Sequence, residues 1–532
     1  MSYTLNVEQD VAIPTRDGGT VCANVFRPNE AGAFPAIVTM GPYPKDIPFE
    51  AWNPVAWQRL PGKGRYMHWE TVDPEWWVPN GYAVVRCDSR GTGKSQGRAR
   101  LLSPSEAEDF HDAIEWAGAQ PWSNGKVGVM GISYFAMTAW RVAALRPPHL
   151  AAIVPWEGAV DLYRDANRHG GIFSNGFLRA WASHRRERSR DAEAADAARE
   201  AGDAQGGAAP LPPETYVELY ARNHPAIADI EVPLLSAGNW GGAGLHLRGN
   251  VEGWLEAGSA QKWLQIHVGD HVAPFYSLEG RLVQLRFLEQ FLRGVDTGMS
   301  REPRVRLAIR DDGDRYHWSY EDEWPIARTV WTELWLDCAA RTIAMERPTP
   351  ETASSYSAER GAADGSVAFS TAQFERETQV TGPVALKLWL SSSGDDADLF
   401  AVLRNVAPDG SEVTYPGPMP GGPRIAAAYG WLRASHRKVD PARSTPYRPF
   451  HTHDEIQKLT PGQPVCVDVE IWPTSIVLAP GHRLVLEIGS HDDPRTTFQH
   501  DDPCDRVHCA TNTIHTGGRF DSRLLLPIVP KR

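Results

Sequence analysis

KVGVMGISYFAMTAWRVAAL, residues 126–145, is the stretch from which the fold can be worked out. Its beginning, KVGVM, is a short apolar run that predicts a buried strand, and its end, MTAWRVAAL, has the apolar spacing of a helix. Between the two stands Ser133, in the sequence GISYF. A serine on such a turn is either the cap of an ordinary helix or a nucleophile exposed at a strand end.

A strand, a tight turn bearing serine and a helix together form the nucleophile elbow of α/β-hydrolases. The turn exposes the serine hydroxyl, and the backbone N–H of the next residue, Tyr134, points to where an oxyanion would form. The usual G-x-S-x-G pattern is incomplete, because Phe135 stands in the place of the second glycine. The motif alone therefore leaves both interpretations open.

The surrounding sequence predicts a parallel sheet. Up to about residue 155, short apolar runs such as FPAIVTM (34–40) and LAAIVPW (150–156) alternate with segments of helical spacing. Such strands are typical of a parallel sheet covered by helices on both faces. VPLLSAGNW (232–240) and KWLQIHVGDH (262–271) resume the alternation. The second of these places His271 just after a strand, where the hydrolase order of nucleophile, acid and histidine expects the base.

Two other regions have a different character. Residues 158–228 contain a charged, Ala-rich helical stretch that runs into a Gly/Ala/Pro linker, which predicts a solvent-facing helical insertion. After about residue 300 the helical spacing stops, and short strand-like runs are divided by Gly, Pro, Asp and Ser. Regular short strands with turn signals predict a β-sandwich or barrel.

Composition narrows the class of protein. A chain of 532 residues is too long for one compact core, so two or three folding units are expected. The net charge of −12 disfavours nucleic acid and an anionic membrane surface as partners. The first twenty residues have neither a basic region nor an apolar one, so no signal peptide is expected. The six cysteines are scattered, as expected of reduced thiols in a cytoplasmic protein.

Several longer stretches resemble one family. GPYPKD (41–46), DSRGTGKSQG (88–97), residues 120–140, DLYRD (161–165) and WPIARTVWTELWLD (324–337) are similar to the X-Pro dipeptidyl-peptidase/cocaine esterase (CocE/NonD) hydrolases. Residues 380–411 with GWLRASHR (430–437) resemble that family's C-terminal jelly-roll domain. The resemblance implies an α/β-hydrolase core at 1–157 and 229–300, a helical cap inserted at 158–228 and a jelly-roll β-sandwich at 301–532.

The resemblance also implies site residues. Ser133 matches the family's nucleophile, and His271 matches its general base. Tyr43 matches the tyrosine whose hydroxyl supplies one oxyanion donor, and the backbone N–H of Tyr134 matches the other. His267 is the alternative base, but it lies within the apolar run LQIHVG, where a side chain is expected to pack.

The family's third catalytic member is missing here. Its aspartate, in a pattern like G-x-W-x-D, corresponds to Gly242 of GNWGG. Loss of the acid that orients the imidazole costs about 10³–10⁴ in turnover, so another carboxylate is needed. Glu157 is the first candidate, because it follows the strand after the nucleophile helix. The weaker candidates are Asp161, Asp165 and Asp270.

Aromatic residues suggest the substrate. The segment after Tyr43 is rich in Trp, and we expect Trp57, Trp156 and Phe135 to line a pocket for a bulky apolar acyl or alcohol group. The leading hypothesis is a serine esterase that acts on a small-molecule ester or amide. It needs no metal and no organic cofactor, and a homo-oligomer is possible.

Three other functions stay open. An X-Pro-type peptidase or amide hydrolase would need a carboxylate to anchor the substrate's amino terminus, and the sequence identifies none. A biosynthetic acyltransferase would pass the acyl group to an acceptor other than water. A non-catalytic binding protein is favoured by Gly242 and disfavoured by the presence together of Ser133, His271 and Tyr43.

Overall fold

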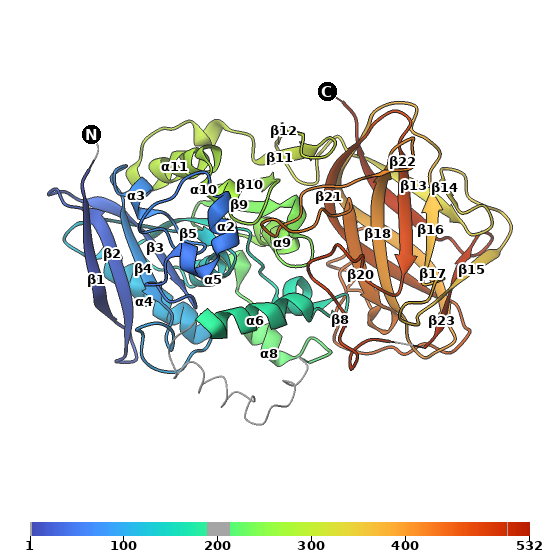
Figure 1. Cartoon of the computed structure of the whole chain (residues 1–532), viewed down its shortest axis with the longest axis horizontal. Helices are drawn as coiled ribbons and strands as arrows, with labels where there is room; N and C mark the ends of the chain where they lie inside the picture. The colour runs from blue at the N-terminus through green and yellow to red at the C-terminus, as the bar shows by residue number, and fades with distance from the viewer. Residues whose placement is uncertain (1–2, 189–212, 508, 532) are drawn as a thin grey trace.

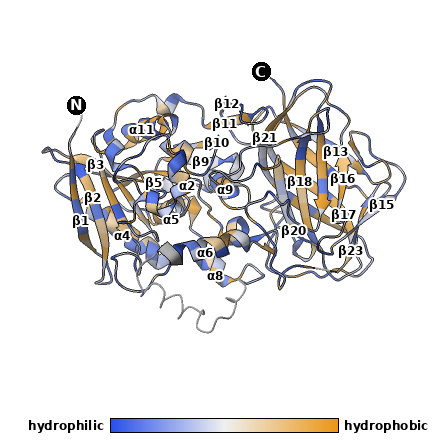
Figure 2. Cartoon of the chain, viewed as in Figure 1, coloured by the Kyte–Doolittle hydropathy of each residue, from blue (hydrophilic) through white to orange (hydrophobic). Residues whose placement is uncertain are grey.

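The structure is a computed structural model that describes residues 3–188, 213–507 and 509–531. Two halves lie side by side along the long axis (Figure 1). The N-terminal half combines strands with helices, whereas the C-terminal half consists mainly of strands. Apolar residues are frequent on the strands of both halves (Figure 2). None of the helices in the described ranges has both the length and the apolar character needed to cross a membrane.

The N-terminal half is built on one twisted sheet with the strand order β1-β2-β4-β3-β5-β6-β9-β10-β11-β12. All pairs from β4 to β11 are parallel, and the pairs at the two edges are antiparallel. The strands are β1 (Leu5–Pro14), β2 (Thr20–Pro28), β3 (Phe34–Gly41), β4 (Ala83–Asp88), β5 (Ser123–Ile132), β6 (Leu150–Trp156), β9 (Leu234–Asn239), β10 (Lys262–His267), β11 (Val305–Arg310) and β12 (Tyr316–Glu321).

The central strands are buried on both faces. On β3, Val38 belongs to one apolar cluster and its neighbour Ile37 to another. Helices α4 (Pro104–Gly118) and α5 (Tyr134–Ala144) contribute to the first cluster, and α11 (Leu278–Arg293) to the second. The strands read as continuous apolar runs because alternate side chains enter two covered faces. The other α-helices outside the inserted segment are α1 (Phe49–Trp52), α2 (Pro54–Arg59), α3 (Pro74–Trp77), α9 (Leu247–Glu256) and α10 (Ala273–Tyr276).

The segment between β6 and β9 contains short elements and one longer helix. They are η1 (Leu162–Asn167), β7 (Arg168–His169), β8 (Ile172–Phe173), α6 (Gly176–Arg188), α8 (Glu218–Asn223) and η3 (Ile227–Asp229). In Figure 1, α6 runs along the lower side of the molecule, from beside the C-terminal half toward the N-terminal half. The charged, Ala-rich stretch expected to be helical falls largely on 189–212, which lies outside the described residues.

The C-terminal half pairs its long strands antiparallel, with β17 against β21 and β24, and β18 against β20 and β22. Its strands are β13 (Val330–Asp337), β14 (Thr342–Ala344), β15 (Thr352–Ser357), β16 (Ser366–Ser370), β17 (Thr378–Ser392), β18 (Asp398–Val406), β19 (Glu412–Val413), β20 (Ala428–Arg433), β21 (Val465–Leu478), β22 (Arg483–Gly489), β23 (Thr511–Thr516) and β24 (Arg523–Val529).

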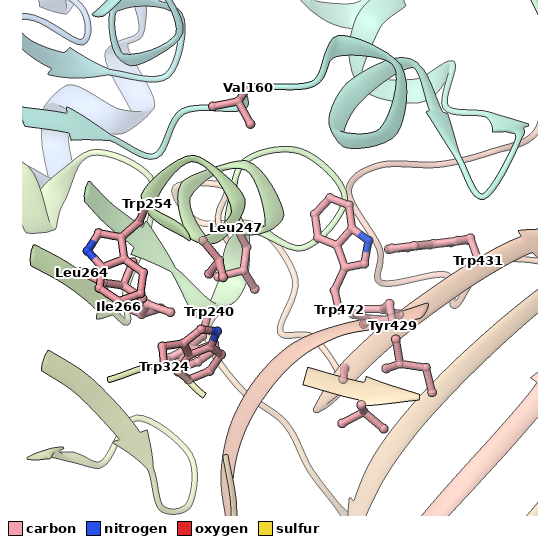
Figure 3. Close-up of a cluster of buried hydrophobic side chains, with 14 of the residues drawn as sticks. Val160, Trp240, Leu247, Trp254, Leu264, Ile266, Trp324, Tyr429, Trp431 and Trp472 are labelled. Carbon is pink, nitrogen blue, oxygen red and sulfur yellow. The ribbon is translucent and has the colours of Figure 1, made fainter. Parts of the chain in front are cut away.

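Apolar packing joins the two halves at the loop that follows β9. Trp240 of that loop packs against Trp324 with ring centroids 6.2 Å apart, and its indole N–H donates to the Ala308 carbonyl at 2.7 Å (Figure 3). The same apolar cluster includes Trp431 and Trp472 of the C-terminal strands. Burial of these rings fixes the path of the loop, which carries residues of the site described below.

The carboxyl ends of the parallel strands meet along one edge of the sheet. Ser133 follows β5, Glu157 follows β6, and His271 lies four residues after β10. Tyr43 lies two residues beyond the end of β3. In open sheets of this kind, ligands bind in the crevice outside the carboxyl ends of the strands.

Candidate active site

Ser133 occupies the strained turn that an exposed nucleophile requires. Its φ of 57° and ψ of −113° place it between β5 and the first residue of α5. A side-chain-bearing residue with such a backbone costs about 1–3 kcal/mol and persists only where its surroundings enforce it. The backbone N–H of Ser133 donates to the Trp156 carbonyl at 2.9 Å, so the neighbouring strand holds the turn. This geometry matches the predicted elbow.

Two glycines compensate for the missing glycine of the elbow motif. A Cβ at Gly131 would lie 2.5 Å from the Phe135 Cβ, and a Cβ at Gly41 would lie 2.6 Å from the Phe135 ring. Phe135 therefore fits only because both positions lack a side chain. Its ring is buried against Tyr43, with centroids 5.7 Å apart.

The hydroxyl of Ser133 is hydrogen-bonded to His246, a residue that the sequence analysis did not single out. The Ser133 Oγ lies 3.1 Å from the His246 Nε2. His246 caps α9 and is buried, and burial together with the nearby charge of His271 lowers its pKa well below the usual value. A neutral ring results, able to accept a hydrogen bond from the serine. The only sequence signal was a histidine in the loop that follows a parallel strand.

The expected pair of Glu157 and His271 is in contact. The Glu157 Oε2 lies 2.8 Å from the His271 Nδ1, and Glu157 is fully buried. The Asn239 side chain donates to the Glu157 Oε1 at 3.3 Å, and the Glu157 backbone N–H donates to the Ala237 carbonyl at 2.7 Å. Glu157 is therefore fixed by β9 and aimed at the histidine two strands away.

A second carboxylate holds the opposite side of the His271 ring. The Glu70 Oε1 lies 3.1 Å from the His271 Nε2. Burial acts to lower the pKa of His271, but the charges and hydrogen bonds of Glu157 and Glu70 outweigh it and raise this pKa to about 10. His271 is thus a cation between two acids in the resting structure. Sequence analysis missed Glu70 because it lies in the long irregular segment between β3 and β4.

The two histidine rings are stacked rather than hydrogen-bonded to each other. The centroids of His246 and His271 are 5.1 Å apart and their planes are inclined by 6°. Ligand atoms of Glu157 and both histidines lie within 4.8 Å of one another, as a metal site would require. Imidazole lone pairs lie in the ring plane, so two parallel rings cannot aim at one ion without rotating. The arrangement therefore fits an acid–base site better than a metal centre.

A cavity of about 310 Å³ opens above Ser133, His246 and His271. Glu70 and Tyr43 also line it. Its remaining walls come from four parts of the chain: the segment after β3 (Trp52, Asn53, Trp69), α6 (Phe177, Ala180, Trp181, His184), the loop after β9 (Leu245), and the C-terminal half (Pro418, Met419, Pro420, Phe498). The backbone N–H of His271 donates to the Pro418 carbonyl at 2.7 Å, which ties the C-terminal half to the site.

Tyr43 and Tyr134, the two residues predicted to bind the oxyanion, differ in what their hydroxyl groups contact. Tyr43 is buried, and its hydroxyl accepts a hydrogen bond from the Trp181 indole at 3.1 Å. Burial, followed by the charge of Glu70, raises the Tyr43 pKa well above its usual value, so the phenol keeps its proton. Tyr134 begins α5, and its own hydroxyl donates to the Glu106 Oε2 at 2.8 Å. The side chain of Tyr134 is thus engaged elsewhere, which leaves its backbone N–H for the predicted role.

The three rings expected in the substrate pocket do not line this cavity. Trp156 is fully buried and stacks on His267, with centroids 5.0 Å apart, because it projects from β6 into the core. Phe135 fills the space left by two glycines, and Trp57 packs against Phe49 at 5.7 Å. The expectation is corrected: the rings that line the cavity are those of Tyr43, Trp52, Trp69, Phe177, Trp181 and Phe498.

The alternative residues do not contact Ser133 or form the hydrogen bond to His271. His267 packs on Trp156 with its Nε2 3.5 Å from the Glu157 Oε1, and burial lowers its pKa to about 3, so it stays neutral. Asp161 pairs with Arg164, and Asp165 pairs with Arg248. Asp270 accepts hydrogen bonds from the backbone N–H groups of residues 272 and 273 at the start of α10. Of the acids weighed from sequence, Glu157 is the one hydrogen-bonded to His271.

Comparisons with known proteins agree over almost the full chain. Residues 17–273 match a family described as X-Pro dipeptidyl-peptidase (S15 family), and residues 297–525 match the X-Pro dipeptidyl-peptidase C-terminal non-catalytic domain. A crystal structure of a CocE/NonD family hydrolase from Staphylococcus aureus superposes with a TM-score of 0.89 at 31% identity, covering 99% of this chain and 94% of the other. The cocaine esterase of a Rhodococcus strain is 24% identical, over 99% of this chain and 99% of its own length.

Proposed function

This chain belongs to the CocE/NonD family of hydrolases, and we propose that it is a serine esterase that cleaves carboxylic esters through an acyl-enzyme intermediate. The observation that carries the proposal is Ser133, held on a strained elbow at the floor of a cavity that also contains a carboxylate-paired histidine. The esterases among its relatives support the choice of ester over other acyl compounds.

We assign the proton transfers to His271. A base that takes the serine proton becomes an imidazolium, and the buried carboxylate of Glu157 at the His271 Nδ1 stabilises that charge. His246 forms no ion pair with any described carboxylate. A protonated His246 would be stacked on the His271 ring, whose positive charge disfavours a second one there. Its role is to hold the Ser133 hydroxyl in the resting enzyme. Catalysis then requires the His271 Nε2 to leave its proton on Glu70, whose pKa is raised by burial, and to exchange the Glu70 Oε1 for the Ser133 Oγ.

The reaction follows from these assignments. The Ser133 Oγ attacks the ester carbonyl carbon while its proton passes to the His271 Nε2. The tetrahedral oxyanion accepts hydrogen bonds from the Tyr43 hydroxyl and the Tyr134 backbone N–H. Collapse breaks the bond to the alcohol, which leaves with the proton from His271. Water, deprotonated by the same histidine, attacks the acyl-enzyme and releases the acid.

The cavity supports a bulky or aromatic group on the substrate. Its volume of about 310 Å³ is at the lower end for small-molecule sites, and most of its wall is apolar. Flat rings pack on aromatic walls with offset or edge-on geometry, which is worth about 0.5–1.5 kcal/mol per pair beyond area burial. We therefore place one aromatic or branched group of the ester among Trp52, Trp69 and Trp181.

A second candidate is an X-Pro-type peptidase, favoured by the S15 family match over residues 17–273. Hydrolysis rates of 4-nitrophenyl acetate, butyrate and benzoate, measured beside those of X-Pro 4-nitroanilides, separate the two. We expect the esters to be hydrolysed, the benzoate included, and the activity to disappear in Ser133→Ala. Faster cleavage of the anilides would assign the peptidase function, and activity retained by Ser133→Ala would refute the mechanism.

Membership of the CocE/NonD family also supports a division of the chain into three domains. We infer an α/β-hydrolase core at 1–157 and 229–300, with a cap at 158–228 and a jelly-roll domain at 301–532, whose first two strands, β11 and β12, continue the core sheet beside β10. The elbow at Ser133 and the order of the parallel strands favour the α/β-hydrolase core. The antiparallel pairing of β17 and β18 with their neighbours favours the jelly-roll domain.

A further inference from the structure

The Gly-rich stretch DSRGTGKSQG (88–97) follows the core strand β4 and has no part in the reaction described above. Its first residue, Asp88, is fully buried and ends β4, in register with Gly41 at the end of β3. Asp88 is not among the described residues that line the active-site cavity. This buried acid at the carboxyl edge of the sheet therefore acts on other parts of the protein rather than on a substrate.

The turn after β4 is folded tightly around the Asp88 carboxylate. The Lys94 backbone N–H donates to the Asp88 Oδ2 at 2.9 Å, and the Ser95 hydroxyl donates to the Asp88 carbonyl at 2.7 Å. Gly93 has a φ of 53°, and a Cβ on it would lie 2.3 Å from the same Oδ2. Only glycine permits such a close approach at this backbone conformation. The turn thus fixes the direction in which the carboxylate points.

The same turn holds the segment that carries Tyr43. The Lys45 backbone N–H donates to the Asp88 Oδ1 at 2.6 Å, and the Ser89 backbone N–H donates to the Gly41 carbonyl at 3.0 Å. These two bonds hold the chain two residues after Tyr43 and two residues before it. The Lys45 ammonium is buried as well, 3.9 Å from the Asp88 Oδ2. The backbone of Tyr43 is therefore fixed between two anchors that both belong to the turn.

Asp88 is suited to hold this segment as a charged group. Burial raises its pKa to about 6, against the opposing hydrogen bonds from the backbone N–H groups of Lys94 and Lys45. The carboxylate is therefore ionised at about pH 8, and an ionised acceptor makes a stronger hydrogen bond than a neutral one. Precision matters here, because a misplacement of about 1 Å in a catalytic group can cost about 10²-fold in rate.

We propose that Asp88 is a positioning residue that sets the place of the Tyr43 hydroxyl in the oxyanion hole. This inference rests on the proposed esterase function and adds to it a residue outside the cavity. Asp88 acts through the backbone of Lys45 and makes no contact with the substrate. The DSRGTGKSQG turn supports the reaction by holding the carboxylate that holds the oxyanion segment.

A double-mutant cycle with Tyr43→Phe tests this role, with kcat and KM measured for a 4-nitrophenyl ester at about pH 8. In Asp88→Asn an amide group replaces one carboxylate oxygen, so one of the two backbone N–H groups loses its acceptor. We expect kcat to fall by about 10- to 100-fold while KM stays within about twofold, because the oxyanion forms only in the transition state. In the Tyr43→Phe background the same substitution should change kcat by less than about threefold, because the hydroxyl that Asp88 positions is absent.

Asp109→Asn is the matched control. Asp109 is also buried, and it is hydrogen-bonded to Arg90 of the same turn at 2.6 Å rather than to the segment of Tyr43. We expect this variant to retain kcat within about twofold. Gly93→Ala places a methyl group against the Asp88 carboxylate and should reproduce the pattern of Asp88→Asn, so the cycle can be completed even if Asp88→Asn fails to fold.

An equal loss of kcat from Asp88→Asn in the wild type and in Tyr43→Phe would overturn the proposal, since the effect would not pass through the hydroxyl. An Asp88→Asn enzyme with unchanged kcat would also overturn it. Labelling of Ser133 with a fluorophosphonate reports separately on the esterase proposal. A labelled wild type whose two substitutions act independently would keep the esterase function and remove the role of Asp88, whereas an unlabelled wild type would remove the function itself.

Discussion

His246 and His271 lie face to face in the active-site cavity, with ring centroids 5.1 Å apart and planes inclined by only 6°. In the serine–histidine–acid triad one histidine contacts both the serine and the acid, whereas here a different ring makes each of these contacts. His246 contacts the Ser133 hydroxyl, and His271 contacts the buried acid Glu157. Stacked rings have no N–H directed at one another, so no proton passes between them in this arrangement. The two histidines must therefore contribute differently to catalysis.

Separate alanine substitutions should reveal that difference. We expect His271→Ala to lower kcat by at least about 10³-fold, because the base that Glu157 stabilises is lost. His246→Ala should cost about tenfold, the size of one lost hydrogen bond to the serine. Steady-state hydrolysis of a 4-nitrophenyl ester measures both values. The reverse ranking would move the base to His246.

Glu157→Gln tests the replacement acid. Loss of the charge that orients and stabilises His271 should lower kcat by about 10³–10⁴-fold while a folded enzyme remains, because glutamine keeps the shape of the side chain. Circular dichroism melting serves as the folding control. A Glu157→Gln enzyme with near-normal kcat would assign the acid's role to Glu70 or to no carboxylate.

Restoring the family's aspartate should rescue that variant in part. A Cβ at Gly242 would have no heavy atom closer than 3.6 Å, and it would lie 3.8 Å from the Cβ of His246. The Cβ of Gly242→Asp therefore has room at this position without backbone movement. In the Glu157→Gln background we expect it to recover about tenfold or more of kcat, because a carboxylate again lies beside the histidines. A double variant no faster than Glu157→Gln would show that position 242 no longer reaches the base.

Tyr43→Phe removes the oxyanion hydroxyl and keeps the ring that packs on Trp52. Loss of one such donor costs about 10²–10³-fold in kcat. The matched control is Tyr82→Phe, which removes another partly buried hydroxyl, bonded to Glu289 rather than exposed to the cavity. We expect the control to retain activity within about twofold, whereas equal effects of the two variants would refute the oxyanion assignment.

The charge of His271 should also make folding stability depend on pH. Its pKa is raised to about 10 in the folded state, above its ordinary value of 6.5. The stabilisation is therefore complete below about pH 6.5 and declines as the pH rises toward 10. We expect His271→Ala to lower the free energy of unfolding most below pH 6.5, and progressively less at higher pH. Urea unfolding of both proteins across this range measures the difference, and a pH-independent difference would contradict the ion pairs.

Much of the strand framework could be predicted from the sequence, because a parallel strand buried on both faces reads as an uninterrupted apolar run. FPAIVTM at 34–40 and LAAIVPW at 150–156 correspond closely to β3 and β6. The contact of Glu157 with His271 was also predictable, since each follows the end of a parallel strand and such ends meet at one edge. The boundaries of the inserted segment stay predictions.

Other parts of the site could not be predicted, for identifiable reasons. His246 and Glu70 lie in segments without periodicity, and only tertiary packing brings them back to the sheet edge. The Trp156 ring was assigned to the pocket because composition does not tell which face of a strand a ring occupies. Phe135 was misplaced because its two compensating glycines, Gly41 and Gly131, are far apart in the sequence.

Intact-mass analysis after treatment with a fluorophosphonate tests the central claim most directly, since it asks whether Ser133 is activated without requiring the natural substrate. The account predicts a single adduct on the wild type, no adduct on Ser133→Ala, and slower labelling of Glu157→Gln. A wild-type protein that stays unlabelled, or an adduct that persists in Ser133→Ala, would contradict it.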